Sequence, residues 1–116
     1  MAIKEIPQAD WTTFLEDVSR ENESGLVTVE VRGDGIPQQA LFTNMPLLGI
    51  AYDSKGSGAG QIDIMVGSDT DNNSSHAVPH PALVKVEETP EGGVQTLLID
   101  GAVGEPITLV HVLTAS

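Results

Sequence analysis

One helical pattern of apolar and polar residues occupies the N-terminal part of the chain. Apolar side chains recur there at i, i+3, i+4 and i+7: Trp11, Phe14, Leu15 and Val18. Polar residues occupy the other side, as in a helix that buries one face. Pro7 suits the first turn of such a helix, and Gly25 is a typical residue just beyond the last turn. The pattern predicts a helix over residues 7–24.

From Leu26 onward the period of the pattern changes to two. Val27, Val29 and Val31 share one face of the first segment and polar residues take the other face, which is typical of a half-buried strand. Clusters of glycine, proline, asparagine and aspartate separate further short segments of strand character. Strands are predicted at residues 26–32, 38–43, 47–53, 61–66, 83–88, 94–100 and 107–113.

The last two predicted strands are apolar on both faces, at residues 97–99 and 109–113. Both faces of such strands must be covered. The N-terminal helix and the opposite wall of a barrel would provide the two covers, and a subunit interface would serve equally well. A homo-oligomer, with a dimer as the first choice, is therefore one expected partner.

These patterns predict a mainly β (α+β) fold. One helix, residues 7–24, packs on an antiparallel β body, residues 26–113. Short strands joined by turn clusters favour a curled antiparallel sheet or a small, partly open β-barrel of about seven strands. Because neither an internal repeat nor a linker interrupts the pattern, residues 1–116 are expected to form a single domain.

Acidic residues dominate the charged positions. The chain has 17 acidic and 5 basic residues, and its formal net charge is −12. The basic residues are scattered, which argues against nucleic acid and anionic membranes as partners. The longest mainly apolar stretch, residues 45–52, is far shorter than a membrane span of about 20 residues. Because the N-terminus also lacks the apolar run of a signal peptide, we expect a soluble, cytoplasmic protein.

A polar loop at residues 69–73 has some features of a calcium site. Asp69 and Asp71 open the alternating series of oxygen ligands with which a calcium loop begins. The glycine and the glutamate that complete such a loop are missing, and Ser74 and His80 stand in their places. Asp, Asn and Ser are also the usual residues of an ordinary polar turn.

Two histidines, His76 and His80, follow this loop and are the most site-like pair in the chain. In an extended chain, histidines four residues apart lie roughly 13 Å from each other, too far to share one zinc ion. A turn, or His111 from the last strand, would have to bring the ligands together. The alternative to hydrogen-bonded or solvent-facing histidines is a small-ligand or metal site built from His76, His80, Asp69 and Asp71.

Segments spread over most of the chain carry a family resemblance: Ile6-Pro7, Trp11-x-x-Phe14-Leu15, Ser19-Arg20, Gly25, and residues 27–31, 46–53, 62–67, 76–81 and 107–110. In order and spacing, these segments resemble a family of small bacterial domains of unknown function, with a Trp-x-x-Phe-Leu helix before a β-rich body. The resemblance implies a stand-alone cytoplasmic domain with no assigned activity, cofactor or catalytic residue. The chain departs from the family pattern at residues 21–24 and at His111, where arginine is more usual.

The predicted function follows from what the sequence contains. Without cysteine, the chain has no disulfide, thiolate metal site or cysteine nucleophile. The sequence shows no convergent set of residues for catalysis, and we expect no enzyme activity and no cofactor. The leading prediction is a small acidic domain that acts through oligomerisation or an unknown protein partner, and the ligand or metal site near His76 and His80 is the alternative.

Overall fold

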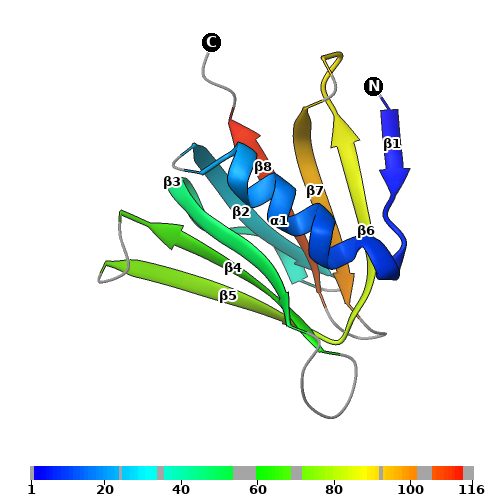
Figure 1. Ribbon diagram of the computed structural model, residues 1–116. Helices are drawn as coiled ribbons and strands as arrows, with labels where there is room; N and C mark the ends of the chain where they lie inside the picture. Colours follow the sequence, from blue (N-terminus) through cyan, green and yellow to red (C-terminus); the bar gives the residue numbers. More distant parts are fainter. Residues whose placement is uncertain are drawn as a thin grey trace.

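The computed structural model describes residues 2–23, 25–33, 36–53, 60–68, 72–91, 93–101 and 106–113. Across these ranges the chain forms one α-helix and eight strands: β1 (Ala2–Glu5), α1 (Trp11–Glu21), β2 (Leu26–Gly33), β3 (Ile36–Asp53), β4 (Gln61–Gly67), β5 (Asn73–Pro79), β6 (Pro81–Glu88), β7 (Val94–Gly101) and β8 (Ile107–Leu113). The strands form one sheet in the order β1-β6-β7-β8-β2-β3-β4-β5 (Figure 1). Every neighbouring pair is antiparallel, which confirms the predicted fold class of a curled antiparallel sheet with one helix.

The N-terminal helix is confirmed, although it begins later than predicted. Pro7 precedes a 3-10 turn, Gln8–Asp10, and α1 starts only at Trp11. The helix lies across one face of the sheet (Figure 1) and buries Trp11, Leu15 and Val18. The indole N–H of Trp11 donates a hydrogen bond to the carbonyl of Ile6 at 2.8 Å, so the one polar atom of this buried ring is satisfied.

Strand β3 bends the sheet and explains how it curls. The two strands predicted at 38–43 and 47–53 are one continuous strand. Its first part pairs with β2 as far as Pro46, and its second part pairs with β4 from Leu47 onward. β3 therefore belongs to two differently oriented parts of the sheet, and the strand order ends at β1 and β5 without closing into a barrel.

The curl turns β5 toward β7 and β8 across the core. His76 on β5 lies 3.3 Å from the hydroxyl of Thr108 on β8, measured between Nε2 and Oγ1. Aliphatic residues from nearly all strands fill the space between, and the largest fully buried side chains are Leu15, Leu47, Ile62, Ile64, Leu97 and Ile99. Apart from Trp11, the buried core is aliphatic, in keeping with the low aromatic content.

Strands β1 and β5 were missed in the sequence. β1 is only four residues long. β5 reads Asn-Ser-Ser-His-Ala-Val-Pro, and of these side chains only Val78 is buried. An edge strand of this polar composition lacks the alternation that identifies a half-buried strand. Within the described residues, no helix is long and apolar enough to cross a membrane.

Candidate functional site

The predicted metal residues are only partly described by the structure. Asp69 and Asp71 lie outside the described residues. His76 is half-buried beside Thr108, and burial lowers the pKa of its imidazole below the usual 6.5. His80 is exposed at the corner between β5 and β6, with a φ of 49°. Among the described residues, no three His, Asp or Glu side chains gather closely enough to hold a metal ion, and the metal site stays a prediction.

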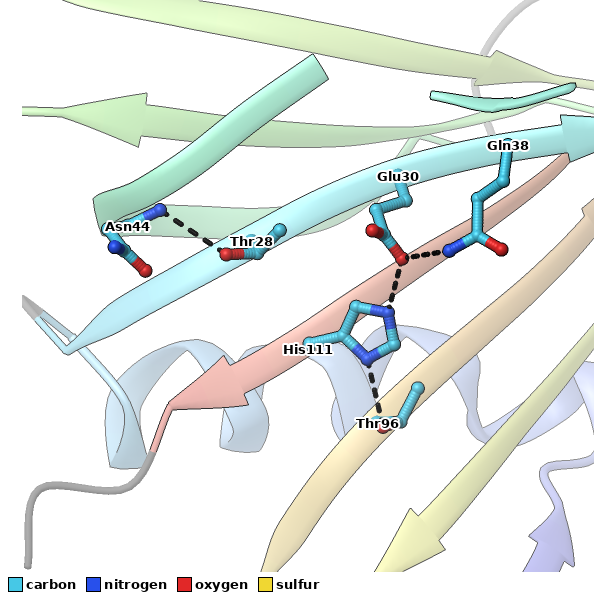
Figure 2. A network of polar contacts seen from close by, with 6 residues as sticks. All are labelled: Thr28, Glu30, Gln38, Asn44, Thr96 and His111. Atoms are coloured by element: carbon cyan, nitrogen blue, oxygen red, sulfur yellow. Dashed lines mark hydrogen bonds and ion pairs between the residues drawn. The ribbon is translucent and has the colours of Figure 1, made fainter. Parts of the chain in front are cut away.

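The three histidines do not converge. His76 meets the core-facing side of β8 at Thr108. His111 lies three residues further along β8, and its side chain is on the opposite face, where it contacts Glu30 and Thr96 (Figure 2). The sheet therefore separates His111 from His76.

A polar network on this outer face connects strands β7, β8, β2 and β3 (Figure 2). Nε2 of His111 lies 2.8 Å from a carboxylate oxygen of Glu30, and the amide of Gln38 donates to the same oxygen at 2.6 Å. On its other side, Nδ1 of His111 lies 3.3 Å from the hydroxyl of Thr96. The cross-strand register sets these contacts, since Thr96 is directly opposite His111. Glu30 is thus held in place by two partners.

The network joins a hydroxyl, an imidazole and a carboxylate, which is the order of groups in a catalytic triad. Such a triad also needs free donors that stabilise a developing oxyanion. Strand β7, which carries Thr96, is paired on both sides, with β6 and with β8. The backbone N–H groups of a central strand are used in these ladders, so the described part of β7 provides no such donor from its backbone beside Thr96.

A groove lies on the other side of the molecule, between α1 and the second part of β3. Where β3 leaves β2, the N–H of Leu47 donates to the carbonyl of Gly25 at 2.8 Å. Further along, the hydroxyl of Ser19 on α1 accepts a hydrogen bond from the N–H of Ile50 at 2.8 Å and lies 2.9 Å from the Ile50 carbonyl. One helix side chain therefore provides partners for the backbone of Ile50 on the strand edge that β2 no longer covers.

The groove has a volume of about 580 Å³ and extends over β3 to β4. Its floor is apolar and includes Gly49, Ala51 and Met65, the last of which is 39% exposed. A Cβ atom added to Gly49 would meet nothing within 4 Å, so this glycine leaves open space in the floor. Glu16, Glu23 and Asp63 line the groove with carboxylates, and one arginine lines it as well.

The residues that build this groove were not singled out as a site in the sequence. Ser19 appeared there only as part of a family motif, and Gly49 and Met65 only as residues of predicted strands and family motifs. A serine at the border of the apolar helix face is a weak signal, because it becomes informative only when the neighbouring strand edge is known. The groove exists because β3 changes partners, which a local pattern does not reveal.

Known proteins provide an independent comparison. Residues 2–113 match a family described as a family of unknown function (DUF5335). An uncharacterized protein of Aquifex aeolicus (strain VF5) is 29% identical over 97 residues, which is 84% of this chain and 80% of that protein. No solved structure matches the chain. The family match confirms the resemblance to small bacterial domains of unknown function. Since it covers nearly the whole sequence, the chain belongs to this family of unknown function.

Proposed function

We propose that the chain is a protein-binding domain. It takes a short apolar segment flanked by lysine or arginine into the groove between α1 and the second part of β3. The observation that carries this proposal is the combination of an apolar floor and an acidic border in one groove. Apolar area supplies affinity, and charge complementarity selects the partner and speeds association.

The charges at the groove favour a basic partner. Glu16 and Glu23 on α1 and Asp63 on β4 are the carboxylates of the lining. The one cation of the lining, Arg20, already pairs with Asp17 within the helix. A lysine or arginine of the partner would therefore meet carboxylates with little competition from the chain's own cations.

A second copy of the chain is a poorer occupant than a basic segment. Each copy carries a formal net charge of −12, so two copies repel each other when they approach. The groove would add its own acidic border to that repulsion. This argument favours the unlike partner over the homo-oligomer, the other partner that the sequence suggests. The family resemblance supports a cytoplasmic setting, which cell fractionation would test.

The test uses a short amidated peptide in which leucines are flanked by lysines. We expect its addition to shift the backbone amide resonances of Gly49, Ala51 and Met65, and we expect the same peptide with glutamates in place of the lysines to leave them unchanged. The double variant Glu16→Gln/Glu23→Gln should weaken binding by roughly five-fold, the range expected for two exposed ion pairs.

A matched control separates the local charges from the overall charge. Glu5→Gln/Glu91→Gln changes the net charge equally at exposed positions that do not line the groove. It should bind the lysine peptide nearly as the parent chain does. Equal binding of the lysine and glutamate peptides would overturn the proposal. A stable dimer in light scattering that dissociates on substitution of Gly49 by leucine would assign the groove to a second copy instead.

A further inference from the structure

A second groove, of about 320 Å³, lies on the outer face of the sheet, the face that α1 does not cover. Leu98 and Leu109 are directly opposite each other on β7 and β8 and form its apolar centre. Leu109 is only 7% exposed, yet it is not part of the main core cluster. The outer face therefore has a small apolar centre of its own.

Two cations approach this centre from opposite sides. Lys85 on β6 is the cross-strand partner of Leu98, and Arg32 lies at the end of β2. Both side chains line the groove. In the part of the chain that the structure describes, the ion pairs of lysine and arginine are Lys4 with Glu88 and Arg20 with Asp17, and neither Lys85 nor Arg32 takes part in one.

Among the described residues, the polar network of Figure 2 engages the carboxylate that lies nearest to Arg32 along its own strand. Glu30 is two residues before Arg32 on β2 and is directly opposite Leu109 on β8. Its carboxylate therefore lies on the same face of the sheet as Arg32 and would be the first ion-pair partner to consider for it. Its carboxylate accepts a hydrogen bond from Gln38 and pairs with His111 (Figure 2). The one carboxylate that lines the groove is that of Glu87. The lining of this groove thus carries two cations and one anion on a strongly acidic protein, and Glu5 on β1 is directly opposite Lys85.

We infer that the outer groove binds an amphipathic monoanion, an unbranched apolar chain that carries one carboxylate. The apolar part would lie over Leu98 and Leu109, and the carboxylate would pair with Arg32 or Lys85. Strands β6 and β2 are three strand spacings apart, about 14 Å, which suits an extended chain of medium length. The volume is near the lower limit of small-molecule sites, which favours such a ligand over a segment of a macromolecule.

The experiment titrates the full chain with octanoate at neutral pH. Octylamine, a cation with an apolar chain of matched length, is the control ligand. Octanoate should shift the amide resonances of Thr96, Leu98 and Leu109, and octylamine should not. The variant Arg32→Gln/Lys85→Gln should bind octanoate roughly five-fold more weakly, since the charge contact of the carboxylate is lost whichever of the two cations it uses.

The control Lys4→Gln/Arg20→Gln removes the same number of charges from residues that are paired elsewhere. It should bind octanoate nearly as the parent chain does. Equal shifts with octylamine, octanoate shifts scattered over the surface, or equal weakening by the two double variants would each overturn the inference. Because this groove shares no lining residue with the groove beside α1, the outcome is independent of the proposed protein-binding function.

Discussion

Replacing Ser19 by alanine tests whether α1 substitutes for a strand beside β3. The hydroxyl of Ser19 accepts a hydrogen bond from the N–H of Ile50 at 2.8 Å and lies close to the carbonyls of Ile50 and Leu15. Ile50 is buried, so water cannot readily replace the lost partner. Leaving such a backbone donor unpaired costs about 1–3 kcal/mol. Alanine regains about 0.5 kcal/mol through its higher helix propensity.

The net expectation for Ser19→Ala is a loss of about 1–2 kcal/mol in the free energy of unfolding. For a chain of 116 residues this corresponds to a melting temperature lower by roughly 3–8 °C. Urea unfolding followed by circular dichroism measures the energy, and hydrogen exchange of the Ile50 amide locates it, since that amide should exchange faster.

Thr13→Ala is the matched control, because Thr13 lies on the exposed side of the same helix. It should leave stability unchanged or raise it slightly. If Ser19→Ala and Thr13→Ala have equal stability and the Ile50 amide stays protected, the helix is not anchored through this hydroxyl, and the reasoning about the groove fails.

Three further outcomes are expected from stability measurements. Gly49→Ala should stabilise the fold by about 0.5–1 kcal/mol, because its Cβ meets open space, whereas Gly67→Ala should destabilise it by more than about 1 kcal/mol. At Gly67 the φ is 144° and a Cβ would clash with the carbonyl oxygen of Asn72. Burial lowers the pKa of His76, so the unfolded chain takes up the proton more readily, and the free energy of unfolding should fall as the pH decreases below about 6.5. His76→Gln should make the free energy of unfolding depend less on pH in this range. The exposed control His80→Gln should leave the pH dependence unchanged. The melting temperature should rise between low and moderate NaCl, because salt screens the repulsion of a chain with charge −12, and a decrease would contradict this.

The sequence predicts those elements whose burial follows a simple period. The stripe of Trp11, Leu15 and Val18 identifies α1, and the alternation from Val27 to Val31 identifies β2. The period does not show that β3 is a single strand with two partners. Nor does it show β5, because a polar edge strand buries almost nothing and so leaves no alternation to read.

The sites depend on tertiary features that local patterns do not contain. Ser19 gains its role only because β3 leaves β2 and exposes backbone groups at Ile50. Arg32 and Lys85 are far apart in the sequence, and only the pairing register brings them to one groove. Two of the five basic residues that are scattered along the chain thus line the same groove.

The most direct test of the central claim is the affinity of the lysine-flanked leucine peptide for the parent chain and for Gly49→Leu. The leucine side chain would fill the open floor of the groove between α1 and the second part of β3 without a backbone clash. Thr43→Leu, an exposed position on the part of β3 that pairs with β2, controls for the added apolar surface. Calorimetric titration should show binding at least about ten-fold weaker for Gly49→Leu, a loss of about 1.4 kcal/mol, and unchanged binding for Thr43→Leu. Equal affinity of Gly49→Leu and the parent chain would contradict the account.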